Sequence, residues 1–272
     1  MKKILVVLNG NIFPEHVVSS AITIAKTSPA LLHAVFMNPM LETKDYDYSF
    51  PNDMSLTRNS ITGDTADEES AEFLKVNAQL FEDMCNTAGI NFLIEPGKQI
   101  SLQGLIEHSA FSDLIITDVS DNSNQHHIID LLSDTCCPVY LVSRHVEKVK
   151  QIILTYDGSF ASIYAIRQYA LVFPEMKDLP THLLHITPDE IIDEFPREKN
   201  IRSWLPVHYS NVVFKILHGN VRTELIKFAQ SIPDSIVVMG AFGRSGLSRL
   251  FHKSLANAVI ADGKSALFIA HK

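Results

Sequence analysis

Glycine-rich residues near the C-terminus have the spacing of an anion-binding loop. The run Met239-Gly240-Ala241-Phe242-Gly243-Arg244-Ser245-Gly246 follows the β-branched stretch 236–238, and glycines let backbone amides approach an anion without a Cβ in the way. Further along the chain, Ser254 precedes an apolar helical pattern, as an N-cap does. A helix N-terminus that faces a glycine loop is a natural phosphate site, and Arg244 and Lys253 add two cations. Because glycines also serve tight turns, the glycine-rich segment alone is weak evidence of phosphate binding.

A second polar stretch stands where the same site would need it. Asp157-Gly158-Ser159 directly follows the apolar run 152–156. In an open parallel sheet, ligands bind beyond the carboxyl ends of the strands, at the point where the strand order reverses. We therefore predict that Asp157 and Gly158 meet Met239 and Gly240 at one edge of a sheet.

The elements that would position these residues occur twice in the chain. Residues 2–10 (KKILVVLNG) match residues 150–158 (KQIILTYDG) at a constant offset, and each segment reads as a buried parallel strand that turns into its crossover. A helical pattern follows in each copy, and in the first copy it is formed by Val17, Ala21, Ile24 and Ala25. Further strands are predicted at 31–37, 91–94, 113–116 and 138–142, and at 181–186, 212–217, 234–238 and 266–270.

Strands that alternate with helices predict right-handed crossovers and a parallel sheet covered on both faces. The predicted fold is α/β, with two tandem doubly wound five-stranded parallel-sheet domains at residues 1–146 and 147–272. The first domain carries an insertion at about 38–66, which is either a functional lid or an inert surface segment. After it, Thr65-x-x-Glu68 looks like a capping box that opens a helix, and Gly89 closes that helix.

The motifs of the second copy resemble those of the universal stress protein family. Gly240-x2-Gly243-x9-Lys253-Ser254 is similar to the family motif G-x2-G-x9-G-[ST], and Asp157-Gly158-Ser159 resembles the family's first-strand signature. The resemblance covers essentially the whole chain as a tandem pair. It implies the UspA-like, adenine nucleotide alpha hydrolase-like fold, which in some members binds ATP or AMP, with or without Mg²⁺, and usually performs no efficient chemical step.

The resemblance also implies where each part of the nucleotide would lie. Asp157 and Gly158 would lie at the adenosine end, and the backbone around Ile186-Thr187 at the base. The ribose and phosphates would meet Met239, Gly240, Gly243, Arg244, Lys253 and Ser254. Lys253 stands where the family has its third glycine, so its charge strengthens phosphate binding or its Cβ obstructs the close approach.

The first copy lacks these features. Asn9 replaces the aspartate, and residues 118–124 (DVSDNSN) contain no glycine. Matching Asp113 with Asp234 and the last strands with each other makes the first copy seven residues shorter between its fourth and last strands. Asp118 and Asp121 would repel phosphate. We therefore predict a structural or protein-binding first domain, unless it binds a different, uncharged ligand.

Composition excludes several classes of function. The formal net charge of −8 gives no general case for nucleic acid binding. No apolar stretch approaches the roughly 18 residues of a membrane span, and the N-terminal run reads as a strand rather than a signal peptide, so a cytoplasmic protein is predicted. Cys85, Cys136 and Cys137 suit a reducing compartment. With His126 and His127 they match no standard zinc spacing, so core thiols are expected rather than a metal site.

Catalytic signatures are missing as well. The nucleophile elbow G-x-S-x-G and the Walker A pattern do not occur. His185 and His218 are expected to satisfy local hydrogen bonds rather than to catalyse, and slow ATP hydrolysis would leave only Asp157 as a base. The segment from Trp204 to Tyr209 is either an aromatic contact surface or core.

Two functions from different classes remain open at this point. One is a nucleotide-sensing stress or regulatory protein with ATP or AMP in the C-terminal domain. The other is a nucleotide-free interaction or scaffold module that acts through an unknown protein partner. The family resemblance further implies that residues 139–142 pair with residues 267–270, which would make the chain an intramolecular pseudo-dimer, and a true homodimer is a further option.

Overall fold

The computed structural model of this chain describes residues 1–9, 13–37, 65–118, 135–240, 256, 258–259 and 262–270. The side chains of residues 9, 65–70 and 95–98 are not included in that description. Nearly all of the predicted insertion at about 38–66 lies outside the described residues.

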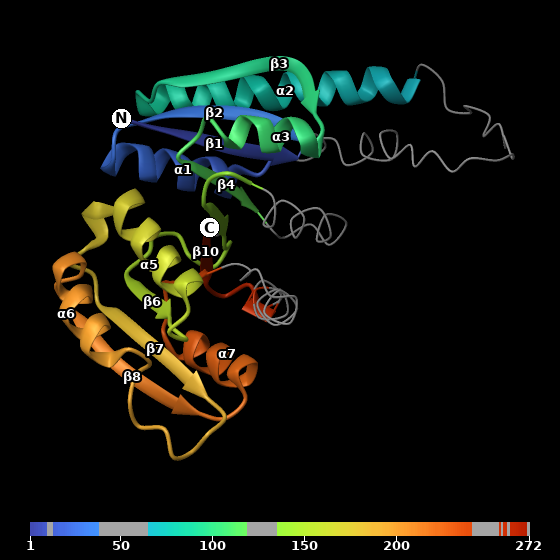
Figure 1. The fold of residues 1–272 in the computed structure, drawn as a ribbon. Helices are drawn as coiled ribbons and strands as arrows, with labels where there is room; N and C mark the ends of the chain where they lie inside the picture. Colours follow the sequence, from blue (N-terminus) through green and yellow to red (C-terminus); the bar gives the residue numbers. More distant parts are fainter. Residues whose placement is uncertain are drawn as a thin grey trace, which may run out of the picture.

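The strands form one continuous ten-stranded sheet in the order β3-β2-β1-β4-β5-β10-β9-β6-β7-β8 (Figure 1). We call β1 to β5 with their helices the N-terminal half and β6 to β10 with theirs the C-terminal half. The strands of the N-terminal half are β1 (Lys2–Asn9), β2 (Ala30–Met37), β3 (Phe92–Ile100), β4 (Leu114–Asp118) and β5 (Val139–Val142). The strands of the C-terminal half are β6 (Gln151–Thr155), β7 (Thr181–Thr187), β8 (Val212–His218), β9 (Ser235–Gly240) and β10 (Ala266–Ala270).

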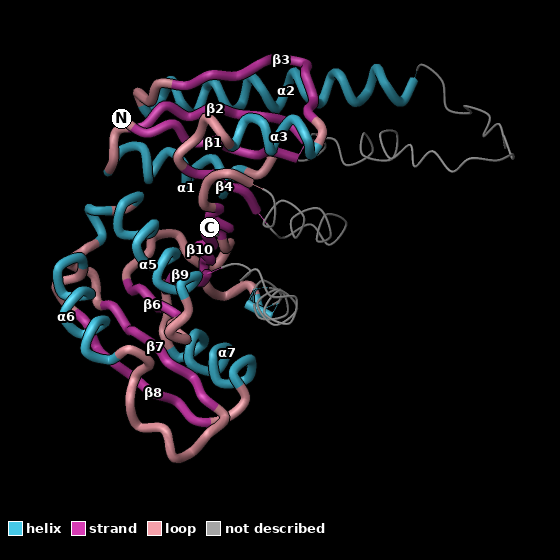
Figure 2. The backbone as a smooth tube through the Cα atoms, viewed as in Figure 1, coloured by secondary structure: helices cyan, strands magenta, loops and turns pink. Residues whose placement is uncertain are grey.

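Helices cover both faces of the sheet, as Figure 2 shows. One buried cluster contains side chains of α1 (Glu15–Thr27), α2 (Thr65–Ala88), α5 (Phe160–Val172) and α6 (Glu198–His208). The opposite cluster contains side chains of α3 (Leu102–Ser109) and α7 (Val221–Ser231). A short 3₁₀ helix, η2 (Pro174–Met176), follows α5. The predicted doubly wound α/β fold is therefore confirmed, but the two halves share one sheet.

The two halves join through their last strands. β5 and β10 pair in antiparallel fashion, with Tyr140 opposite Phe268. All other neighbouring strands in the sheet are parallel. The predicted pairing of residues 139–142 with residues 267–270 is confirmed, and we call this junction the seam.

Strand register corrects the length comparison between the copies. Leu5 pairs with Ile115 and Ile153 pairs with Val237, so equivalent residues of β4 and β9 are 122 positions apart (237 − 115). Ile115 pairs with Val139 and Val237 with Leu267, so β5 and β10 are 128 positions apart (267 − 139). The N-terminal half is thus six residues shorter between these strands, not seven. The sequence comparison matched Asp113 with Asp234, but these two residues stand at different positions relative to their strands. Tyr140 and Phe268 are equivalent residues, so the seam is a pseudo-twofold junction.

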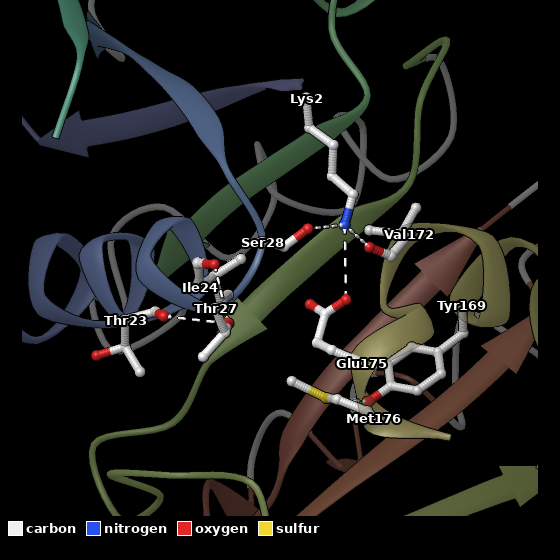
Figure 3. Close-up of polar contacts among 9 residues, drawn as sticks. All are labelled: Lys2, Thr23, Ile24, Thr27, Ser28, Tyr169, Val172, Glu175 and Met176. Carbon is white, nitrogen blue, oxygen red and sulfur yellow. Dashed lines mark hydrogen bonds and ion pairs between the residues drawn. The ribbon is translucent and has the colours of Figure 1, made fainter. Parts of the chain in front are cut away.

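Aromatic packing and a partly buried amine hold the seam together. The Tyr169 ring lies 5.1 Å from the Phe173 ring and 5.1 Å from the Phe268 ring. On the other side, Lys2 Nζ donates hydrogen bonds to Ser28 Oγ and to the Val172 carbonyl, and it lies 4.0 Å from Glu175 Oε2 (Figure 3). Burial lowers the pKa of Lys2, and the Glu175 charge opposes this. Lys2 therefore links the first strand of the chain to the end of α5.

The predictions for the buried face of α1 and for the end of α2 are confirmed, and the prediction for the end of β3 is corrected. The α1 residues Val17, Ala21, Ile24 and Ala25 are all buried, as predicted. Helix α2 ends at Ala88, and Gly89 follows it with φ +68°, a conformation that favours glycine. β3 continues to Ile100 rather than ending at residue 94, because an edge strand tolerates Pro96 and its register with β2 shifts between Ala34 and Phe36.

Within the described part of the chain, no helix has both the length and the hydrophobicity that crossing a membrane requires.

Candidate functional site

The carboxyl ends of three strands meet at one edge of the C-terminal half. β6 lies between β9 and β7, and all three strands are parallel. Leu154 pairs with Val238, and Thr155 pairs with Leu184. The sheet therefore brings six predicted residues to this edge: Asp157, Gly158, Ile186, Thr187, Met239 and Gly240. The other four, Gly243, Arg244, Lys253 and Ser254, lie outside the described residues.

Asp157 is held at this edge by a tight turn. Its side chain is exposed, and its Oδ1 accepts a hydrogen bond of 2.9 Å from the Ser159 amide. Ser159 is the N-cap of α5, and its Oγ accepts a hydrogen bond of 3.1 Å from the Ser162 amide. Side-chain acceptors of this kind satisfy amides that a helix start leaves without partners. The turn thus fixes a carboxylate where the resemblance places the adenosine end of a nucleotide.

β6 and β7 separate next to the predicted base-binding backbone. The last ladder bond runs from the Tyr156 amide to the Leu184 carbonyl, at 2.9 Å. The Tyr156 carbonyl then accepts from Nδ1 of the buried His185 ring, at 2.9 Å. Since a carbonyl can only accept, His185 carries its proton on Nδ1. Ile186 and Thr187 lie beyond the last β6 pair, and they pair with β8.

The two histidines that could have been catalytic are used locally. His185 Nδ1 bonds to the Tyr156 carbonyl, and His218 Nδ1 lies 3.1 Å from the Asp189 carbonyl. Both partners are backbone acceptors, so the prediction of local hydrogen bonding is confirmed.

Both described glycines of the site are required by packing. Gly158 has φ +76°, and a Cβ built on it would lie 2.4 Å from Pro196 Cβ. A Cβ on Gly240 would lie 2.5 Å from the Ala161 carbonyl carbon and oxygen, and 2.8 Å from the Ser162 amide nitrogen. Real Cβ atoms do not approach other atoms so closely. These two glycines therefore bring α5 and the segment around Pro196 close to the strand ends, whether or not a ligand is bound.

Residues 195–197 form part of this edge, which no sequence pattern indicated. The Tyr156 hydroxyl donates to the Pro196 carbonyl at 2.8 Å, and the buried Phe195 ring lies 6.0 Å from the His185 ring. Arg197 adopts φ 54°, and its guanidinium lies 4.5 Å from the centre of the Phe160 ring. This segment therefore lies against the turn that carries Asp157. No local pattern predicts such contacts, because they join distant parts of the chain.

The surroundings of Tyr156 favour the protonated form of its hydroxyl. Burial raises the pKa of the Tyr156 hydroxyl, while the Arg197 charge lowers it and the Asp157 charge raises it. The hydroxyl therefore remains a donor to the Pro196 carbonyl.

The equivalent edge of the N-terminal half has different chemistry. By strand register, Asp118 occupies the position of Gly240. Asp118 Oδ2 lies 2.5 Å from His16 Nε2 and 3.6 Å from Arg144 Nη2. The cavity that Asp118, Ser143 and Arg144 help to line has a volume of about 130 Å³. A carboxylate thus stands where the other half has a glycine, while Asp121 lies outside the described residues.

The cysteines only partly follow the expectation of core thiols. Cys85 and Cys137 are buried, and burial raises their pKa values to about 11 and about 12. Cys136 is exposed. Within the described ranges, no three His, Cys, Asp or Glu side chains are grouped to hold a metal ion. His126 and His127 lie outside those ranges.

In the segment 204–209 the predicted core role is confirmed, because Trp204 is partly buried and packs against the core. Leu205 and Tyr209 are buried in the core, and Tyr209 donates to the Ile166 carbonyl at 3.0 Å. Val207 is 76% exposed on the same helix. The buried face belongs to the core, and the other face is open to solvent.

Comparison with known proteins identifies the fold and matches part of the sequence to a family. Residues 207–270 match the model of the Universal stress protein family. A universal stress protein from Archaeoglobus fulgidus DSM 4304 superposes with a TM-score of 0.70 at 14% identity, covering 98% of this chain and 96% of that chain. A putative universal stress protein from Pseudomonas aeruginosa UCBPP-PA14 gives 0.63 at 17% identity, covering 100% of this chain and 93% of that one. No curated protein matches in sequence.

Proposed function

We propose that this chain, whose residues 207–270 belong to the universal stress protein family and whose fold is that of the family, is a cytoplasmic adenine-nucleotide sensor. In this proposal the chain has two domains, residues 1–146 and 147–272, and ATP or AMP binds to the second. Binding changes the conformation of the protein or its choice of protein partner.

The observation that carries the proposal is the convergence of strand ends around Asp157. Its carboxylate is held at the point where β6 leaves the sheet between β9 and β7. In parallel sheets this is where ligands bind. β6 makes no pair with Ile186 or Thr187, and in this proposal the backbone of these two residues would read the edge of a base.

The remaining contacts of the proposal come from the glycine segment. Met239 and Gly240 end β9 at this edge. Gly243, Arg244, Lys253 and Ser254 would continue from there to the ribose and phosphates, with Mg²⁺ bound alongside ATP. The N-terminal half does not bind a phosphate in this proposal, because the Asp118 carboxylate stands where the C-terminal half has Gly240 and already contacts His16 and Arg144.

One observation favours the alternative of a nucleotide-free interaction module. Pro196 lies directly on Gly158, and packing alone explains both Gly158 and Gly240. A chain that keeps the fold without the ligand would keep these residues too. The two functions therefore differ in what they predict for nucleotide binding.

Isothermal titration with ATP and AMP, with and without Mg²⁺, distinguishes them. We expect wild-type binding in the micromolar range. The Asp157→Ala variant should bind about 10- to 100-fold more weakly, since a hydrogen bond to a charged group contributes about 1.5–3 kcal/mol.

A matched control is Asp178→Ala. Asp178 is exposed and accepts a hydrogen bond from Ser210 Oγ, far from the carboxyl edge. This variant should bind like the wild type. If neither ATP nor AMP binds the wild type, or if the two variants lose affinity equally, the sensor proposal fails and the interaction module is favoured.

A further inference from the structure

A cavity of about 280 Å³ lies at the junction of the two halves, away from the proposed nucleotide site. We call it the seam cavity. Its walls include Ser20 and Ile24 of α1, Tyr140 of β5, Val146 and Val149 of the connection to β6, and Met176 of η2. Figure 3 shows Ile24 on one side of this junction and Met176 on the other.

Two differences between the halves create the seam cavity. Helices α1 and α5 have equal lengths, so Ile24 and Ser28 occupy the positions of Tyr169 and Phe173. The Tyr169 and Phe173 rings pack near Phe268, whereas the smaller Ile24 side chain lines the seam cavity together with Tyr140. The crossover after α5 is also longer than the one after α1, and it places η2 across this space. The seam cavity therefore follows from the particular side chains of this chain.

The surface inside the seam cavity is mainly apolar, and its lining includes the side chain of Tyr140. Tyr140 is 5% exposed, and burial raises its pKa well above the usual value. Among the described residues, its hydroxyl has no hydrogen-bond partner. Buried tyrosine hydroxyls normally find a partner, so a polar atom of a ligand would be stabilised here.

Charge and size further restrict the ligand. Three charged residues line the seam cavity: Glu147 and Lys148 carry opposite charges, and Glu175 Oε2 lies 4.0 Å from Lys2 Nζ, so the charges at the cavity balance. A volume of this size holds roughly ten non-hydrogen atoms of an organic molecule, at about 30 Å³ for each water-sized group.

We propose that the seam cavity binds a small neutral amphipathic molecule, with an apolar body between α1 and η2 and one hydroxyl or carbonyl oxygen at Tyr140. Such a ligand contacts both halves of the chain. Its binding does not depend on the nucleotide proposal.

Titration of the full chain with 2-phenylethanol, followed by calorimetry and by backbone amide NMR, tests this proposal. We expect saturable binding with shifts at α1 and at residues 174–179. Ser20→Leu should weaken binding at least about tenfold, because its side chain occupies the cavity. Tyr140→Phe should weaken binding about three- to tenfold through the loss of one hydrogen bond.

The matched control is Ser19→Leu, which makes the same change at an exposed position on the same helix. It should bind like the wild type. Absence of saturable binding, or equal affinity of the wild type and Ser20→Leu, would overturn the site. Tyr140→Phe retains the shape of the side chain and removes a hydroxyl without a protein partner, so wild-type affinity in this variant would overturn the proposed polar contact.

Discussion

The Phe268→Ala variant is expected to lose about 3–5 kcal/mol of unfolding free energy, the usual cost of truncating a buried phenylalanine. Phe268 is fully buried at the centre of the seam, opposite Tyr140 and 5.1 Å from the Tyr169 ring. Its loss removes contacts that both halves share. For a chain of this size the thermal midpoint should fall by about 10 °C, as measured by circular dichroism.

Phe111→Ala is the matched control for this prediction. Phe111 is 78% exposed, so the same truncation removes little buried surface. Its effect should stay within about 0.5 kcal/mol. If Phe268→Ala costs as little as Phe111→Ala, the aromatic packing at the seam does not stabilise the chain as described.

The Gly240→Ala variant is the second substitution with a large expected effect. A Cβ at this position meets backbone atoms of Ala161 at 2.5 Å, and backbone atoms at a helix start cannot rotate aside as a side chain can. We expect a loss of about 3 kcal/mol, at the upper end for overpacking, measured by urea denaturation. α5 would have to move away from the end of β9.

Gly104→Ala makes the same change where there is room. Gly104 lies in α3, and its nearest neighbours to an added Cβ are Ile100 Cβ at 3.5 Å and Ser101 Oγ at 3.7 Å. Alanine should stabilise the helix there by about 0.5–1 kcal/mol. A Gly240→Ala variant as stable as the wild type would contradict the close approach of α5 and β9.

The strands were predictable because their signal is local. β-branched runs such as those that contain Ile4 and Ile152 are buried on both faces, and nothing competes with that pattern. Asp157 was also predictable, since a polar residue and glycine at the end of such a run mark the carboxyl edge of the sheet. The pairing of the last strands came from the family resemblance, and the register of β5 and β10 confirmed it.

Other features were not predictable because they depend on contacts between distant residues. The approach of Pro196 to Gly158 joins a loop after β7 to the turn after β6. The seam cavity lies between Ile24 of α1 and Met176 of η2, which the helical pattern of α1 alone does not indicate. The extent of β3 depended on its position at the edge of the sheet. Each of these features depends on packing between residues that are far apart in the sequence.

Hydrogen–deuterium exchange of the full chain, with and without saturating ATP and Mg²⁺, tests the central claim most directly. The account predicts slower exchange of backbone amides at residues 157–160 and 186–187, and unchanged exchange at residues 30–37 in the equivalent strand of the N-terminal half. No change anywhere, or slowing confined to the N-terminal half, would contradict nucleotide binding at the carboxyl edge of β6, β7 and β9.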